Sequence, residues 1–235
     1  MSDEIVRHRL EEKVAVIEMD DGKVNAISRS MIDALDRALD RAEKEAKAIV
    51  LCGRTGRFSG GFDLGAMRAG AEQARALVGR GAELALRLYA FPLPVVIACT
   101  GHAIAMGAVL LLGGDTRLGA EGDFKIGLNE VSIGLALPPF ALRLAEARLS
   151  KRHLVRATLE AEIYAPSGAV DAGFLDRVTS PERLAVEALA EANRLAALDR
   201  LAFQATKVGL RSDTIARIRA EERTLPTSSS PQANP

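Results

Sequence analysis

A single glutamate stands in an otherwise apolar stretch of the sequence, where a carboxylate could move protons. Glu130 is the only charged residue between Lys125 and Arg143. An apolar environment removes water from a carboxylate and raises its pKa toward the working range of a general base. The alternative is that Glu130 points into solvent from a loop, because glutamate is rarely buried without a partner.

A glycine-rich segment, residues 56–64 (GRFSGGFDL), follows an apolar run of strand length. Adjacent Gly60 and Gly61 permit unusual backbone angles and the close approach of a ligand, so the N–H group of Phe62 could point into a cavity. We expect Asp63 to cap the helix that follows. The segment has neither a G-K-[ST] sequence nor a G-x-S-x-G frame, which argues against a phosphate-binding loop and a nucleophile elbow. An ordinary strand-to-helix turn is the alternative.

Residues 100–109 (TGHAIAMGAV) are typical of a turn that opens onto an apolar helix. The N–H groups in the first turn of a helix lack intrahelical acceptors and carry partial positive charge, which suits a developing oxyanion. Small residues around Met106 would admit a ligand, or would only permit tight helix packing. Ser59 with His102 would give a hydrolase pair, but no motif supports it, and we expect His102 to be a turn histidine.

The elements that would position these residues alternate between strand and helix. This alternation predicts an α/β domain followed by a helical tail. From residue 139 onward the pattern is mainly helical, with an interruption at 173–178. We expect strands at residues 14–19, 48–52, 95–98, 115–120 and 123–126, and helices at 29–46, within 64–89 and at 103–112.

Composition and charge narrow the function classes. The chain has 235 residues, of which 48% are hydrophobic, and its 31 basic residues balance its 31 acidic ones. No global positive field would attract nucleic acid or anionic lipid, so we expect neither as a partner. The stretch at residues 88–114 has no formal charge but contains two prolines, and we interpret it as core rather than as a membrane span.

The sequence contains no pattern for a metal or redox cofactor. Cys52 and Cys99 lie in apolar runs without ligand spacing, and we expect reduced, buried thiols. A His/Cys cluster and a dinucleotide fingerprint are both missing, so we expect no metal and no cofactor. The N-terminus lacks the apolar segment of a signal peptide, and we expect a cytoplasmic protein.

Five short motifs, in order and at suitable spacing, resemble the crotonase (enoyl-CoA hydratase/isomerase) superfamily over about residues 5 to 210. The family's S-A-G-x-D-L and N-G-x-A-x-G-G-G are similar to SGGFDL and TGHAIAMG here. Its P-E-x-x-x-G-L is similar to NEVSIGL, which contains Glu130. Its V-N-A-L-S and A-x-x-x-G-L-V-D-x-V are similar to the remaining two motifs. In this chain the five matches occupy residues 24–28, 59–64, 100–107, 129–135 and 172–178.

The resemblance implies a crotonase-like α/β fold, a spiral of ββα units with a C-terminal helical segment. It implies a core domain at residues 1–180 and a helical oligomerisation segment at 181–225, and we expect 226–235 to be a disordered tail. It also implies a homotrimer or a dimer of trimers. The substrate would be an acyl-CoA thioester, and no further cofactor is implied.

The resemblance also implies roles for the singled-out residues. The backbone N–H groups of Phe62 and Met106 would form an oxyanion hole for the thioester, and Glu130 would be the catalytic acid and base. A hydratase of this family uses a second glutamate, whose position is occupied here by Val109. Residues 126–130 (IGLNE) resemble mitochondrial-type Δ3,Δ2-enoyl-CoA isomerases, which favours an isomerase acting in fatty acid metabolism. An enoyl-CoA hydratase and a non-catalytic acyl-CoA-binding paralogue remain alternatives.

We expect substrate and CoA contacts from residues near these motifs. The C-terminal segment departs from the family's pattern, and Phe203 and Lys207 are the candidates there for CoA contacts. The acyl pocket is expected to be lined by Leu64, Met67, Leu135, Leu137 and Phe140. The full set of expected substrate contacts is Lys23, Val24, Ala26, Gly60, Gly61, Asp63, Leu64, His102, Gly107, Leu135 and Lys207.

Overall fold

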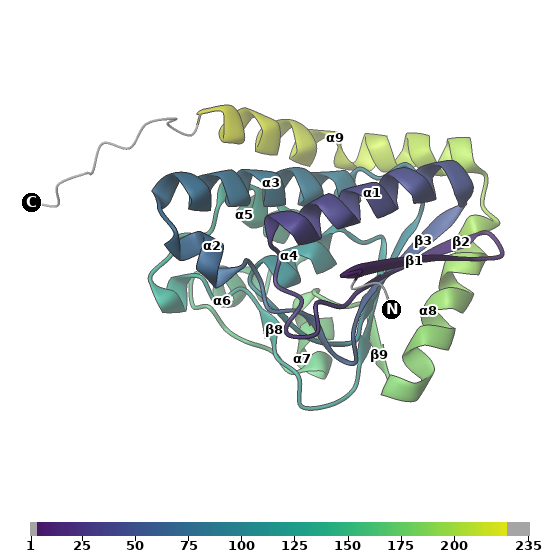
Figure 1. The fold of residues 1–235 in the computed structure, drawn as a ribbon, viewed down its shortest axis with the longest axis horizontal. Coiled ribbons are helices and arrows are strands. Elements are labelled where there is room, and N and C mark those ends of the chain that lie inside the picture. The colour runs from purple at the N-terminus through teal and green to yellow at the C-terminus, as the bar shows by residue number, and fades with distance from the viewer. Residues whose placement is uncertain (1–3, 225–235) are drawn as a thin grey trace, which may run out of the picture.

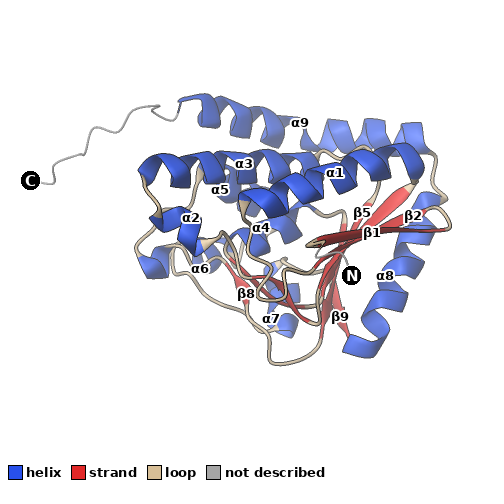
Figure 2. Ribbon diagram, viewed as in Figure 1, coloured by secondary structure: helices blue, strands red, loops and turns tan. Residues whose placement is uncertain are grey.

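The structure, a computed structural model, describes residues 4–224. Its larger sheet has six strands in the order β1-β2-β3-β5-β7-β9. β1 pairs antiparallel with β2, and every other neighbouring pair is parallel. The strands are red in Figure 2. They are β1 (Val6–Glu11), β2 (Val14–Met19), β3 (Ala48–Gly53), β5 (Val95–Cys99), β7 (Thr116–Ala120) and β9 (Arg177–Thr179).

A second, smaller sheet consists of three parallel strands, β4 (Gly56–Ser59), β6 (Gly101–Ile104) and β8 (Ile126–Gly127), in that order. Each of these strands directly follows a strand of the larger sheet and precedes a helical segment, so a β-β-α unit repeats three times along the chain. This is the arrangement that the resemblance implied.

Helices cover both faces of the larger sheet. Ala15 and Ile17 of β2 belong to the main core cluster, whereas Val14 and Val16 belong to a second cluster on the opposite face. α1 (Arg29–Glu45) packs on the first face and α8 (Pro181–Ala196) on the second. Figure 1 shows α8 on the side of the sheet away from α1. A strand buried on both faces requires a continuous apolar sequence, as the central strands β3 and β5 have.

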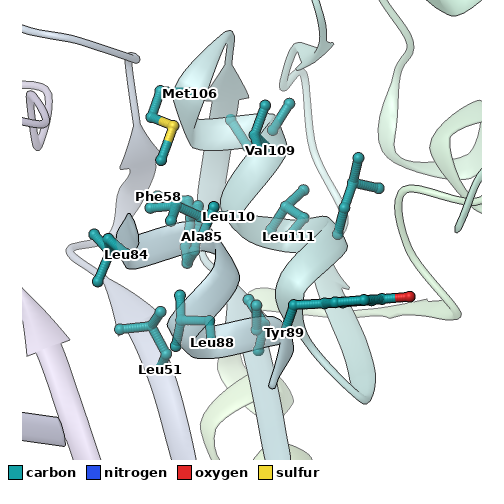
Figure 3. Close-up of a cluster of buried hydrophobic side chains, with 14 of the residues drawn as sticks. Leu51, Phe58, Leu84, Ala85, Leu88, Tyr89, Met106, Val109, Leu110 and Leu111 are labelled. Carbon is teal, nitrogen blue, oxygen red and sulfur yellow. The ribbon is translucent and has the colours of Figure 1, made fainter. Parts of the chain in front are cut away.

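α4 (Met106–Gly113) lies in the middle of the main core. All of its residues are buried, and none of its side chains is charged. Leu84, Ala85 and Leu88 of α3 (Ala71–Tyr89) face this helix in the hydrophobic cluster of Figure 3. A helix without a polar face is stable only when it is surrounded by other elements.

The C-terminal helix α9 (Arg200–Thr224) packs on the outside of the helices that cover the main core. It packs against α5 (Pro139–Arg148) and α3, and it runs along α3 in Figure 1. Among the described residues, no helix is long and apolar enough to cross a membrane. The short elements are α2 (Leu64–Arg68), the 3-10 turn η1 (Val131–Ile133), α6 (Leu154–Thr158) and α7 (Pro166–Ala172).

Several predicted elements differ from the structure. Residues 101–104 form a strand, so the helix expected at 103–112 begins only at Met106. The helical segment expected within 64–89 is divided at Gly70, whose φ of 148° is accessible to glycine. The strand expected at 123–126 is the two-residue β8, and β1 and β4 were not predicted. The disordered tail expected at 226–235 lies outside the described residues.

Candidate active site

The three candidate segments leave the same edge of the small sheet. β4 leads to Gly60 and Gly61, β6 leads to Ala105, and β8 leads through two residues to Glu130. Because the strands are parallel, their carboxyl ends lie together, which is where ligands bind in many parallel sheets. The N–H group of Ala105 donates to the carbonyl oxygen of Gly127 at 3.0 Å and continues the β6–β8 pairing to this edge.

The N–H group of Phe62 is directed by a bridge between its segment and Ile27. The N–H of Ile27 donates to the Gly61 carbonyl oxygen at 2.8 Å, and the N–H of Asp63 donates to the Ile27 carbonyl oxygen at 3.2 Å. The Gly61 carbonyl group and the Asp63 N–H group therefore face Ile27. Because the C=O and N–H of one peptide group point in opposite directions, the N–H of Phe62 points away from Ile27.

Met106, the second expected donor, stands at the first position of α4. Its N–H has no acceptor within the helix, and the whole first turn is buried. Ala105, just before it, has a φ of 52° and a ψ of −123°, a strained conformation for a residue with a side chain. This strain turns the chain sharply from β6 into α4.

The two donor segments touch each other. A methyl group on Gly61 would lie 3.0 Å from the Cβ of Ala105 and 3.6 Å from the backbone nitrogen of Met106. Gly61 also has a φ of 96°, which favours glycine. The structure therefore brings Phe62 and Met106 to neighbouring positions, and a glycine is required between them.

Glu130 follows β8 and precedes the turn η1. Its Oε2 is buried and has no hydrogen-bond partner among the described residues. Burial raises the pKa of this carboxyl above its ordinary value of 4.5, although a backbone hydrogen bond opposes the shift. The N–H of Leu135 donates to the Glu130 carbonyl oxygen at 2.9 Å and closes the loop that holds the glutamate. Such a carboxylate can exchange a proton with a bound molecule.

A cavity of about 450 Å³ lies beside the Phe62 segment. It is bordered by the loop after β2 and the loop after β4, whose backbones join where the Gly60 N–H donates to the Val24 carbonyl oxygen at 2.8 Å. Seven of the expected substrate contacts line this cavity, namely Lys23, Val24, Ala26, Gly60, Gly61, Asp63 and Leu64.

Asp21 and Asp63 fix the rim of this cavity. Asp21 accepts hydrogen bonds from the N–H groups of Lys23, Asn25 and Ala26 at 2.7, 2.8 and 2.9 Å. The expected cap at Asp63 is confirmed, because its Oδ1 accepts from the N–H of Ala66 at 2.7 Å. The rim is therefore ordered by hydrogen bonds to the backbone.

His102 and Ser59 do not form a hydrolase pair. The Oγ of Ser59 donates to the Asn25 carbonyl oxygen at 2.7 Å. The Nδ1 of His102 accepts from the N–H of Lys125 at 3.0 Å, and its ring stands edge-on to Phe124. Burial, with the nearby Arg57 and Lys125, lowers the pKa of His102. His102 lies within β6 and is not the turn residue that we expected.

Three other expected site residues, Lys207, Phe140 and Gly107, have different surroundings from those foreseen, whereas Leu135 stays a prediction. Lys207 is 6% exposed and ion-paired with Asp115 in the protein interior, so the structure does not bring it to the cavity. Phe140 is fully buried in the main core and does not line an open acyl pocket. Gly107 packs against Ser59, and Leu135 is 49% exposed on the Glu130 loop.

Val109, at the position of the missing glutamate, is 1% exposed and belongs to the hydrophobic cluster of α4 (Figure 3). Within residues 4–224, no group of three or more His, Cys, Asp or Glu side chains could hold a metal ion. Sequence reasoning missed Asn25, a fully buried residue with a φ of 52°. A polar residue inside the V-N-A motif was the only available signal.

Comparisons with known proteins show which family the chain belongs to. A profile of the family "Enoyl-CoA hydratase/isomerase" matches residues 9–228. A probable enoyl-CoA hydratase of Bacillus subtilis is 33% identical over 54% of this chain and 50% of its own length. The human mitochondrial enoyl-CoA delta isomerase 1 is 30% identical over 87% of this chain and 70% of its own length.

The fold agrees as well. The crystal structure of an enoyl-CoA hydratase/isomerase family protein from Pseudomonas syringae is 42% identical, with a TM-score of 0.92 over 94% of this chain and 96% of that one. The architecture of a larger and a smaller sheet built from β-β-α units is thus the crotonase fold. On the profile match and this structural agreement, the chain belongs to the enoyl-CoA hydratase/isomerase family.

Proposed function

We propose that this protein isomerises a 3-enoyl-CoA to a 2-enoyl-CoA, with Glu130 as the single acid and base. The observation that carries the proposal is the buried Oε2 of Glu130, which has no hydrogen-bond partner among the described residues and follows the same edge of the small sheet as the two candidate N–H donors. The similarity to the human delta isomerase along most of the chain supports it.

The proton balance of this reaction needs one carboxylate. Glu130 removes a proton from C2 of the thioester, and the electron pair of that C–H bond delocalises into a dienolate. The carboxyl group then returns the proton to C4, so the double bond moves from C3=C4 to C2=C3. No electron is exchanged with a cofactor, and the glutamate is regenerated.

The N–H groups of Phe62 and Met106 stabilise the negative charge on the thioester oxygen. Each such donor in a site without water contributes about 3 kcal/mol to the transition state. The Met106 donor adds the dipole of α4, whose eight residues are all buried. Together these groups make removal of the C2 proton feasible for a carboxylate.

The residue at position 109 favours isomerisation over hydration. Adding water across a double bond requires groups that orient and split the water. Val109 is apolar and 1% exposed, so it provides no such group. A hydrophobic wall beside one carboxylate favours a proton transfer without release of the proton to water.

A paired assay tests the reaction. The purified protein is incubated with a trans-3-enoyl-CoA and, separately, with a trans-2-enoyl-CoA, and the absorbance of the conjugated thioester is followed. We expect a rise with the first substrate and little loss with the second. Loss with the second substrate would identify a hydratase. Acyl-CoA binding without change in either would identify a non-catalytic binding protein.

Two variants assign the role of the glutamate. Glu130→Gln keeps the size of the side chain but removes the proton acceptor, so we expect acyl-CoA binding with turnover lowered at least 10²-fold. The exposed Glu121 provides a matched control, and Glu121→Gln should keep wild-type turnover. Unchanged isomerase turnover in Glu130→Gln would refute the assignment. The homotrimer or dimer of trimers and the fatty acid pathway stay predictions.

A further inference from the structure

We propose that Ser59 is a positioning residue that holds both oxyanion donors in register. The inference rests on the oxyanion site of the proposed function and adds the residue that sets its geometry. Ser59 lies at the end of β4, is fully buried, and contacts three separate segments of the site.

The first two contacts are hydrogen bonds of the Ser59 hydroxyl group. Its Oγ donates to the Asn25 carbonyl oxygen at 2.7 Å. The same oxygen accepts from the N–H of Gly61 at 3.3 Å. The hydroxyl therefore ties the loop after β2 to the Gly60–Gly61 peptide, one peptide before the N–H of Phe62, and both backbone groups would lose this partner without it.

The third contact is with the start of α4. A methyl group on Gly107 would overlap the carbonyl oxygen of Ser59 and lie 2.9 Å from its Cβ. The first turn of α4 thus rests directly on Ser59, and Gly107 is the neighbour of the donor residue Met106. One residue therefore contacts both donor segments.

The loop after β2, to which the Ser59 hydroxyl is bonded, is held by further hydrogen bonds of Asn25. The Nδ2 of Asn25 lies within hydrogen-bond distance of the carbonyl oxygens of Met19, Arg57 and Phe58, at 2.9, 3.1 and 3.2 Å. Its Oδ1 accepts from the N–H of Asp21 at 3.0 Å. Because Asn25 is anchored to β2 and β4, the bond from Ser59 transmits a fixed position to Gly61 and hence to Phe62.

Removing the hydroxyl should therefore loosen the Phe62 segment of the oxyanion site, whereas the contact of the Ser59 carbonyl oxygen and Cβ with α4 remains. In Ser59→Ala we expect kcat to fall roughly 10- to 100-fold, with KM within about twofold of wild type. This is less than the 10²- to 10³-fold loss typical of deleting a donor, because both N–H groups are still present.

The decisive measurement is the infrared C=O stretch of a bound thioester. A saturated acyl-CoA with an isotope-labelled carbonyl binds without reacting, so the readout does not depend on turnover. Two hydrogen bonds to the oxygen lower the stretching frequency, and displaced donors lower it less. Ser59→Cys, which fills the same space with a weaker donor, replaces Ser59→Ala if that variant does not fold.

Thr158 gives a matched control. Its buried hydroxyl donates to the Leu154 carbonyl oxygen, also at 2.7 Å, in α6. Thr158→Val removes a hydrogen bond of the same kind and should keep the wild-type carbonyl frequency. A smaller frequency shift in Ser59→Ala than in wild type and Thr158→Val supports the proposal.

Two outcomes overturn it in distinguishable ways. A carbonyl shift in Ser59→Ala equal to that of wild type would show that Ser59 does not position the donors, with the oxyanion site intact. No shift in the wild type would mean that Phe62 and Met106 do not bind the thioester oxygen, so the oxyanion part of the proposed function would fail together with this inference.

Discussion

Lys207 and Asp115 form a buried ion pair that joins α9 to the segment before β7. The Nζ of Lys207 lies 2.7 Å from Oδ2 of Asp115, and their side chains are 6% and 12% exposed. The Nη2 of Arg211 lies 2.9 Å from Oδ1 of the same carboxylate, and the N–H of Val95 donates to Oδ2 at 2.7 Å. The lysine that we expected at the CoA site thus stabilises the fold.

Substituting Asp115 should lower the free energy of unfolding more than substituting Lys207. Asp115→Asn leaves two buried cations without a counter-charge, and we expect a loss of about 3–5 kcal/mol in the free energy of unfolding. Lys207→Met leaves the carboxylate paired with Arg211, so we expect a loss of about 1–3 kcal/mol. Thermal denaturation of both variants measures the difference. We expect the melting temperature of Asp115→Asn to fall by roughly 10 °C, and that of Lys207→Met to fall by less. An equal or larger drop for Lys207→Met would contradict it.

The local chemistry of the site could be predicted from the sequence, because it lies in short contiguous motifs. Residue type alone draws attention to the glycine pair Gly60–Gly61 before Phe62, and to the isolated Glu130. The burial of Lys207 could not be predicted in this way. Its partner Asp115 is 92 residues away in sequence, and only the packing of α9 brings the two together.

β4 and β6 of the small sheet were missed, and β8 was expected as a longer strand, for the same physical reason. β6 and β8 contain four and two residues, which is too short for a recognisable hydrophobic alternation. Their strand conformation depends on pairing with β4 and with each other, at positions far apart in sequence. The long apolar strands β3 and β5, in contrast, are evident from composition alone.

Ala105 carries strain that a glycine would relieve. Its φ of 52° and ψ of −123° cost about 1–3 kcal/mol for a residue with a Cβ. We expect Ala105→Gly to change the free energy of unfolding by about +1 kcal/mol, because the flexibility that glycine adds to the unfolded chain offsets part of the gain. Turnover should stay near wild type, since the proposed donor is the N–H of Met106 and not a group of Ala105.

Ala103 is the matched control for this substitution. It is fully buried in β6 and is not among the residues with positive φ, so Ala103→Gly should lower the melting temperature. Chemical denaturation of both variants measures whether each substitution raises or lowers the free energy of unfolding. If Ala105→Gly were as destabilising as Ala103→Gly, the turn before α4 would not be strained.

The buried, ionised carboxylate of Glu130 should lower the free energy of unfolding at neutral pH. Its folded-state pKa is raised above 4.5 by burial, so the folded protein binds more protons than the unfolded chain over the interval between the two pKa values. Its contribution to stability is therefore present at acid pH and is lost as the pH rises. We expect Glu130→Gln to melt above wild type at neutral pH, with a difference that disappears below pH 4.5.

The same pKa determines the acid limb of the activity profile. In the proposed reaction the carboxylate must be ionised to remove the C2 proton, so kcat/KM should fall as the pH drops through the raised pKa, with a midpoint above 4.5. Steady-state rates between neutral and acid pH, with folding monitored in parallel, measure this midpoint. A midpoint at or below 4.5 would mean that Glu130 is hydrated in the working enzyme.

Asp21 should control substrate affinity through the cavity rim. Burial tends to raise the pKa of its carboxyl, but hydrogen bonds from the N–H groups of Asn25, Ala26 and Lys23 outweigh this and lower it. Without these bonds the rim that carries Lys23 and Ala26 loses its fixed conformation. We expect Asp21→Ala to raise KM for an acyl-CoA about tenfold with kcat within about twofold, because Glu130 and the donors are untouched.

Asp20 is the neighbouring control. It accepts one backbone hydrogen bond, from the N–H of Gly22 at 3.0 Å, and pairs with Arg7 at 2.8 Å on the protein surface. Asp20→Ala should therefore leave KM within about twofold of wild type. Because a carboxylate with a lowered pKa loses its hydrogen bonds only at acid pH, the KM of the wild type should rise there while that of Asp21→Ala stays constant. Equal KM values for Asp21→Ala and wild type at neutral pH would show that acyl-CoA binding does not depend on the order of this loop.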